Sequence, residues 1–220
     1  MPARVVPTRE PKAPRIPRSL SPATDHELVH DGRYVSLAYG TATITGSEVE
    51  DVEFERCRFE RTRFAAVTLH RAGLSDVDLQ GCDLANLRLF NSRIFNASVA
   101  DCRMTGLQLP EGGVRDVVFD GCRADLVSFR FARMRDVVFR DCNLSESSFQ
   151  EAELHNVRFE GCKLVATQFS NVAMKNVRFA GCDFNGVRGI TSFDGATVAG
   201  ADAMSLLGAL TSALGIRIED

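Results

Sequence analysis

Long hydrophobic runs are absent from this sequence of 220 residues, which has no stretch of eighteen apolar residues that could cross a bilayer as a helix. Its first nineteen residues hold five prolines and five basic residues but no apolar core, unlike a secretory signal peptide. The seven cysteines are odd in number, which argues against a disulfide framework. We therefore expect a cytoplasmic protein without membrane contact. Its N-terminal arm, residues 1–30, should be flexible, rich in Pro and Arg and inclined to polyproline II.

A large excess of positive or negative charge is also absent. The formal net charge is −3, with +2 on residues 1–43 and −5 on residues 44–220. Neither part carries the strong positive excess that supports sequence-independent binding to phosphates. The composition therefore argues against direct binding of nucleic acid.

Groups that commonly carry catalysis are few and scattered. The four histidines are His26, His30, His70 and His155. None of them is spaced with a serine, cysteine or carboxylate in a catalytic pattern, and no glycine-rich phosphate loop follows a strand into a helix. We therefore predict that the chain is not an enzyme and has no catalytic, cofactor-binding or metal-binding residues.

A five-residue period dominates the rest of the chain. From Ile44 to Phe184, every fifth residue is large and apolar at 28 of 29 positions, and eleven of the fifteen phenylalanines fall in this register. Two residues earlier lies a second register of small or β-branched residues, such as Val52 and Cys57. The other three positions of each five are mostly polar.

This period fits neither the 3.6 residues of a helical turn nor the simple alternation of a long strand. It fits a chain that turns a corner after every short extended side, with the large residue and the small one two before it pointing inward. A single five-residue unit cannot bury its apolar pair, whereas stacked units can. The period therefore predicts a solenoid.

The length of one coil follows from residues that recur every twenty positions. One such series is Cys82, Cys102, Cys122, Cys142, Cys162 and Cys182, and another is Asp76, Asn96, Asp116, Asp136, Asn156 and Asn176. Twenty residues are four fives, so each coil has four sides. Residues 42–186 then make roughly seven coils and a shaft about 35 Å long, at about 4.8 Å between stacked strands.

The cysteine series also tests for a metal or a disulfide. Zinc requires ligands that converge on one point, whereas these side chains lie in a line along one inner face. Parallel side chains also fail the dihedral requirement of a disulfide. Buried cysteine packs as a small hydrophobic residue, and we expect that role here.

The repeated segments "CRFER", "CDLAN", "CNLSE" and "VRFEG" resemble the pentapeptide-repeat proteins, whose consensus is Ala-(Asp/Asn)-Leu-x-x. The resemblance covers about two-thirds of the chain without an insertion, although Cys and Val replace Ala at the small inward position. It implies an all-β solenoid, a right-handed quadrilateral parallel β-helix, which we place at residues 44–188. Residues 31–43 are expected to form an N-terminal cap.

Residues 189–220 are expected to close the other end. The pattern predicts a helix over residues 203–214, with Asp202 as its N-cap and Gly215 as its stop, followed by a short strand. The apolar residues of this segment are Met204, Leu206, Leu207, Leu210, Leu214, Ile216 and Ile218. They either only cap the last coil or also dimerise. In gyrase-targeting members of the family a similar C-terminal helix and tail form the dimer interface, so the resemblance implies a homodimer.

Outward-facing positions also stack every twenty residues. The candidate partner-binding residues are Phe90, Phe95, Phe131, Arg93, Arg115, Arg133, Arg135 and Lys175, of which the basic ones form a stripe together with His155. Outward Val118 and Val138 add apolar surface. Three interpretations remain open: the charges pair with neighbouring rungs and are merely solvated, the N-terminal arm folds back over the aromatic residues, or another protein binds there.

Two functional hypotheses follow. The first is a non-catalytic scaffold that binds another protein through its rigid surface. The alternative, implied by the resemblance, is a DNA-mimicking dimer that binds type II topoisomerase (DNA gyrase) and protects it from quinolones or peptide toxins. The modest charge of −5 and the basic stripe weaken this second hypothesis.

Overall fold

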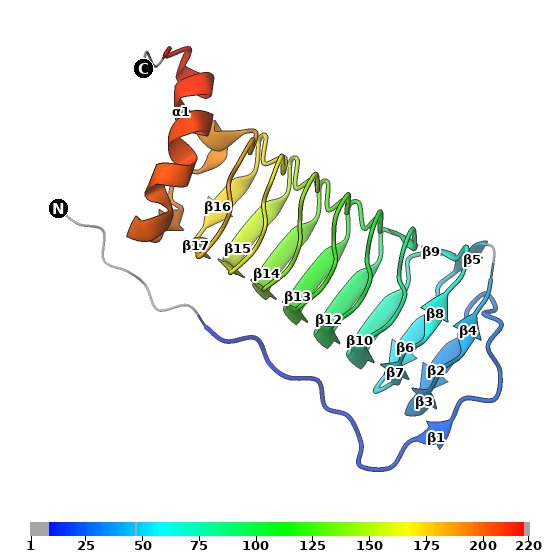
Figure 1. Ribbon diagram of the computed structural model, residues 1–220. Helices are drawn as coiled ribbons and strands as arrows, with labels where there is room; N and C mark the ends of the chain where they lie inside the picture. Colours follow the sequence, from blue (N-terminus) through cyan, green and yellow to red (C-terminus); the bar gives the residue numbers. More distant parts are fainter. Residues whose placement is uncertain (1–8, 47, 218–220) are drawn as a thin grey trace.

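The computed structural model describes residues 9–46 and 48–217 and shows a right-handed, four-sided parallel β-solenoid of about nine turns. Helix α1 (Leu207–Leu214) closes its C-terminal end (Figure 1). The strands of the longest sheet follow one another in chain order, as expected when each coil stacks on the one before. Among the described residues, no helix is long and apolar enough to span a bilayer.

The expected number of coils, about seven, was too low because rungs form beyond the predicted repeat at both ends. Strands β2 (Arg33–Val35) and β3 (Leu37–Tyr39) pair in parallel with β6 (Glu53–Glu55) and β7 (Arg58–Glu60) at a twenty-residue spacing. At the other end, β18 (Thr197–Val198) pairs with β17 (Arg178–Ala180). The segment expected as an N-terminal cap thus forms a rung of the sheet.

Five long strands make up the middle of the solenoid and pair residue for residue at a spacing of twenty. They are β10 (Gly73–Gln80), β12 (Arg93–Ala100), β13 (Gly113–Asp120), β14 (Arg133–Arg140) and β15 (Glu153–Glu160). The shorter strands are β1 (Ser21–Pro22), β4 (Thr43–Ile44), β5 (Glu48–Glu50), β8 (Arg63–Phe64), β9 (Thr68–His70), β11 (Arg88–Phe90) and β16 (Ala173–Lys175).

Each corner of the solenoid places one residue in the left-handed region. These residues fall at every fifth position, for example Asp76 (φ 50°), Asn96 (φ 49°) and Asp116 (φ 54°). Asp and Asn tolerate this conformation better than other side chains, which explains their frequency at the corners. Leu126 (φ 60°) and Phe131 (φ 58°) adopt it despite their bulk.

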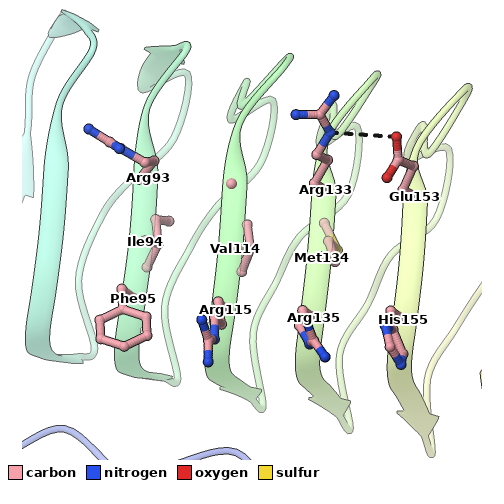
Figure 2. Close-up of a pocket in the computed structure, with 11 residues that line it drawn as sticks. Arg93, Ile94, Phe95, Val114, Arg115, Arg133, Met134, Arg135, Glu153 and His155 are labelled. Carbon is pink, nitrogen blue, oxygen red and sulfur yellow. Dashed lines mark ion pairs between the residues drawn. The ribbon is translucent and has the colours of Figure 1, made fainter.

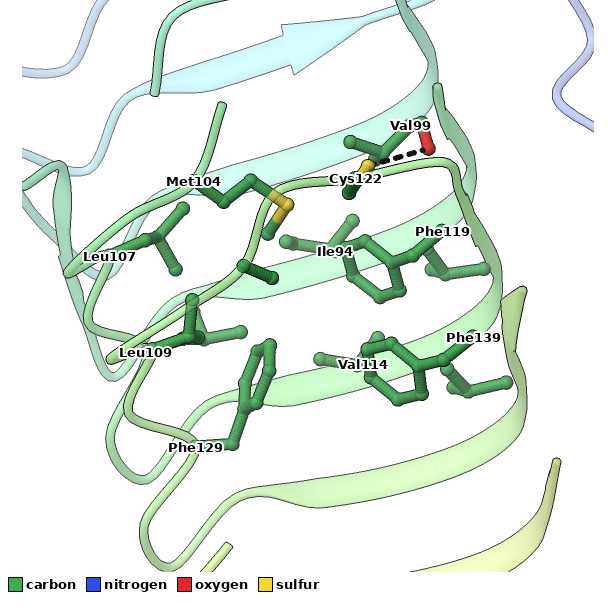
Figure 3. Packing of buried hydrophobic residues seen from close by; sticks show 14 of the residues in the cluster. Ile94, Val99, Met104, Leu107, Leu109, Val114, Phe119, Cys122, Phe129 and Phe139 are labelled. Carbon is green, nitrogen blue, oxygen red and sulfur yellow. Dashed lines mark hydrogen bonds between the residues drawn. The ribbon is translucent and has the colours of Figure 1, made fainter. Parts of the chain in front are cut away.

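The predicted inward register forms the core. All its members are buried except Met174, which is partly buried. The rings of Phe119, Phe139 and Phe159 stack with centroids 4.8 and 5.1 Å apart, one per rung. Aliphatic side chains such as Ile94 and Leu109 replace the rings in the preceding rungs (Figure 3). A small apolar cavity of about 30 Å³ remains there.

The cysteines pack in this core as predicted. All seven are buried and free. Their thiols lie near main-chain carbonyl oxygens, as where Sγ of Cys122 donates to the oxygen of Val99 at 3.3 Å (Figure 3). Burial also raises the pKa of the Cys57 thiol above its usual range.

The C-terminal segment begins with two 3₁₀ helices, η1 (Ile190–Ser192) and η2 (Gly200–Leu206), and α1 follows directly. Gly215 ends α1 in the left-handed conformation, as predicted. The prediction that Asp202 caps the helix was wrong. Asp202 lies inside η2, and its Oδ2 accepts hydrogen bonds from the N–H groups of Gly181 (2.6 Å) and Cys182 (3.3 Å). The Asp202 carboxylate therefore gives hydrogen-bond partners to main-chain N–H groups of the last rung.

The apolar residues of this segment divide into two groups. Leu206 is buried against the last coil. Exposed to solvent are Met204, Leu207, Leu210, Leu214 and Ile216. Ile216 is not part of a strand, and Ile218 lies outside the described residues.

Candidate functional site

A depression on the solenoid lies across the first halves of β12 to β15. Its volume is about 480 Å³. Two rows of outward side chains border it, one on each side of the buried Ile94, Val114 and Met134 (Figure 2). The first row is Arg93, Gly113, Arg133 and Glu153, and the second is Phe95, Arg115, Arg135 and His155. We call this depression the basic trough.

Gly113 has no side chain, so it leaves a gap in the first row between its strand partners Arg93 and Arg133. An added Cβ at Gly113 would lie 3.5 Å from Cγ of Arg93, which is an ordinary van der Waals contact. The fold therefore does not require glycine at this position. Its effect is to leave room between the side chains of Arg93 and Arg133.

The arginines of the trough are only partly neutralised by neighbouring acids. Nε of Arg133 lies 3.5 Å from Oε1 of Glu153, and Nε of Arg115 lies 3.4 Å from Oδ2 of Asp116. These two arginine side chains are still 79% and 51% exposed, so most of their donors face solvent. The Arg133–Glu153 pair is long and exposed on both sides and so contributes little to stability. Both guanidinium groups remain available to an acidic ligand.

Phe95 adds an apolar surface to this basic region. Its side chain is exposed at the end of the second row, and the guanidinium of Arg115 lies 5.6 Å from the centre of its ring. Lys175 on β16 continues the second row beyond His155. The structure thus brings together Arg93, Phe95, Arg115, Arg133, Arg135 and Lys175 on one face of the solenoid.

The other two candidate aromatic residues lie elsewhere. Phe131 occupies the preceding corner, beneath the guanidinium of Arg130, and borders a second depression that adjoins the trough at Arg133. Phe90 is half-buried on β11, where its ring stacks on His70 at 5.2 Å. The three rings therefore do not form one cluster.

Residues 9–20 of the N-terminal arm extend along the outside of the solenoid (Figure 1). Its main chain bonds to side chains of the central rungs, as where the N–H of Lys12 donates to Oδ1 of Asp116 at 3.0 Å. Val138, expected to face solvent, is buried on this side of the solenoid. The composition of the arm suggested free solvation, because contacts made by main-chain groups leave no apolar pattern in the sequence.

Comparisons with known proteins give the following matches. A model of the pentapeptide repeat region matches residues 92–157, and a model of pentapeptide repeats (8 copies) matches residues 50–86 and 152–188. No curated protein matches the sequence significantly. A solved structure of full-length QnrB1, described as a plasmid-mediated fluoroquinolone resistance protein, is 16% identical, with a TM-score of 0.42 over 81% of this chain and 99% of that one. HetL, described as involved in heterocyst differentiation regulation in the cyanobacterium Nostoc sp. Strain PCC 7120, is 15% identical, with a TM-score of 0.33 over 76% and 87%.

Proposed function

The chain belongs to the pentapeptide-repeat family, and on that premise we propose that it is a non-catalytic scaffold that binds another protein through the outer surface of its solenoid. The observation that carries the proposal is the basic trough, in which four arginines and an exposed phenylalanine border one depression. Arginine and aromatic residues are enriched at protein interfaces and dominate their binding energy.

The fold suits this role because it fixes the spacing of the side chains. The strands beneath the trough are hydrogen-bonded in parallel, with residues of each row one rung apart. A surface that is ordered before binding loses little conformational entropy on association. The trough therefore fixes its outward positions about 4.8 Å apart, with Arg115 and Arg135 on adjacent rungs of the second row.

The chemistry of the trough indicates an acidic partner surface. Guanidinium groups form paired hydrogen bonds with carboxylates, and Phe95 would contact an apolar side chain of the same partner. The seven free, buried cysteines support a cytoplasmic location for this complex.

The test begins with affinity capture from an extract of the native cell and continues with the purified partner. We expect Arg93→Glu combined with Phe95→Ala to weaken binding at least tenfold. Lys163→Glu is the control, because it makes the same charge change on another exposed residue. Lys163 follows Glu153 of the first row by ten residues, which is half a coil, and so lies on another side of the solenoid. Equal losses in the two variants, or no loss in either, would remove the trough from the proposal.

A DNA-mimicking dimer that binds type II topoisomerase is the second candidate function. The exposed apolar residues Leu207, Leu210 and Leu214 of α1 favour the dimer that this function needs. The arginines of the trough oppose it, because they would repel a DNA-binding groove. A gyrase supercoiling assay with and without a quinolone separates the candidates, and no effect at tens of micromolar protein would exclude this one.

A further inference from the structure

A line of Asp and Asn residues follows one corner of the solenoid beside the basic trough. Its members, here called the Asp/Asn ladder, are Asp76, Asn96, Asp116, Asp136, Asn156 and Asn176. All adopt left-handed backbone conformations with φ between 49° and 55°. Their side chains hydrogen-bond along the line, as where Nδ2 of Asn96 donates to Oδ1 of Asp76 at 3.3 Å. The central members are buried, and Asp116 is fully so.

The arm crosses this ladder with a regular set of contacts. The carbonyl oxygen of Arg9 accepts a hydrogen bond from Nδ2 of Asn156 at 3.0 Å. The N–H of Lys12 donates to Asp116 at 3.0 Å, and that of Arg15 donates to Asp76 at 2.9 Å. Each step of three residues in the arm therefore advances by two rungs of the solenoid.

This step matches the geometry of polyproline II. That helix rises about 3.1 Å per residue, so three residues cover roughly 9.3 Å. Two rungs of a parallel sheet cover roughly 9.6 Å. A polyproline II chain can thus stay in register with the ladder over its whole length, without strain in either partner.

The sequence of the arm repeats with the same period of three. Proline occupies positions 11, 14 and 17, and arginine or lysine occupies positions 9, 12, 15 and 18. Proline has no N–H to donate and holds its own φ near that of polyproline II. The basic positions supply the donated N–H groups, and the guanidinium of Arg9 lies 3.7 Å from Asp116 and 3.8 Å from Asp136.

The arm does not use everything that the ladder offers. Oδ1 of Asn96 is buried and has no hydrogen-bond partner among the described residues. It lies between the rungs that bind Lys12 and Arg15. Residues 9–20 of the arm also supply no buried residue to the core, whereas Leu28, nearer the first rung, is buried in it. Release of residues 9–20 would leave the core of the solenoid intact.

We propose that the Asp/Asn ladder is a binding site for a polyproline II segment of the pattern (Arg/Lys)-x-Pro, and that the N-terminal arm occupies it until a partner protein's segment of that pattern displaces it. This site adjoins the basic trough, because Arg115 and Arg135 of the trough lie 3.4 and 3.9 Å from Asp116 and Asp136 of the ladder, but it does not depend on the function proposed for the trough. It combines acceptors at a fixed spacing with negative charge from Asp76, Asp116 and Asp136.

The test uses the full-length chain and a fluorescent, end-blocked peptide with the sequence of residues 9–18, followed by fluorescence anisotropy. Lys12→Pro in the chain removes the N–H group that donates a hydrogen bond to Asp116 and so loosens the arm. Because the ladder is then less occupied, we expect this variant to bind the peptide at least tenfold more tightly than the wild type. Lys12→Ala removes the same charge but keeps the N–H, and Ala13→Pro adds a proline elsewhere in the arm. The affinities of these two control variants for the peptide should be close to that of the wild type and well below that of the Lys12→Pro variant.

The same substitution in the peptide must act in the opposite direction. A peptide with Lys12→Pro should bind the Lys12→Pro chain at least tenfold more weakly than the unchanged peptide does. Equal affinities of the two peptides, or no binding of the unchanged peptide by the Lys12→Pro chain, would overturn the proposal. If the peptide instead converts a dimer of the wild-type chain into monomers, a second copy supplies the segment and the assignment to a partner protein is wrong.

Discussion

The ring of Phe193 stacks on that of Phe179, with centroids 5.0 Å apart and planes 5° from parallel. Phe193 lies outside the five-residue register, yet it continues the column of stacked phenylalanines by one further ring. It also meets Phe169 edge to face at 5.3 Å. A side chain from the irregular C-terminal segment thus covers the end of the aromatic core, which would otherwise face solvent.

We expect Phe193→Ala to lower the free energy of unfolding by about 2–4 kcal/mol, because it uncovers the last rings and removes a large apolar side chain. Urea unfolding followed by circular dichroism measures the change. Val29→Ala, at an exposed position near the other end, should cost less than about 0.5 kcal/mol. Similar values for the two variants would show that Phe193 does not close the core.

The corner at Leu126 provides a test of backbone strain. Leu126 has φ 60° and is 53% exposed, so its side chain gains little from packing. Left-handed conformations cost a bulky residue about 1–2 kcal/mol, and Asn tolerates them better. We expect Leu126→Asn to raise the free energy of unfolding by about 0.5–1 kcal/mol. Lys163→Asn, at an exposed position of a β-bridge, should give no gain; a gain there of the same size would point to a cause other than the corner.

A structural feature could be predicted from the sequence when the interaction that stabilises it repeats along the chain. Burial in a stacked solenoid repeats every five and every twenty residues, so the inward register and the cysteine column could be predicted position by position. The role of Asp202 could not be predicted in this way, because it does not repeat. Its local sequence is typical of an N-cap, but its carboxylate instead accepts hydrogen bonds from the N–H groups of Gly181 and Cys182 in the last rung.

The candidate site was predictable only in part for the same reason. The rows of the basic trough follow from the twenty-residue repeat. The separation of Phe90 and Phe131 from Phe95 depends on the corner geometry, which local sequence does not specify. That the arm folds back over the solenoid was one of the interpretations left open, but its docking on Asp76, Asp116 and Asn156 was not predicted. These contacts rest on main-chain groups of the arm, although the spacing of Pro11, Pro14 and Pro17 was a usable signal.

Burial of Cys57 makes stability depend on pH. The folded state holds the pKa of this thiol above its ordinary value of about 9, because burial disfavours the thiolate. The unfolded chain therefore loses its proton first as the pH rises, and the free energy of unfolding falls above about pH 9. Urea unfolding at pH 7.5 and 9.5 should show this fall. Cys57→Ala should reduce this fall in the free energy of unfolding, and alanine is tolerated in the inward register, as at buried Ala72. An unchanged pH dependence in this variant would assign the fall to other groups.

Helix α1 presents the largest group of exposed apolar side chains in the described part of the chain. Leu207, Leu210 and Leu214 fall on one side of the helix, and all three are more than 40% exposed. Contiguous apolar surface of this kind marks an interface more often than a solvated face, so we expect a homodimer formed through α1.

Sedimentation at micromolar concentration measures this directly. The wild type should sediment at twice the chain mass of 24.1 kDa, and Leu210→Glu combined with Leu214→Glu should sediment as a monomer, because each buried carboxylate would lack a partner. Ser212→Glu places the same charge on the opposite side of α1 and should leave the dimer intact. A wild-type chain that sediments only at 24.1 kDa would show that the helix caps the solenoid without joining two copies.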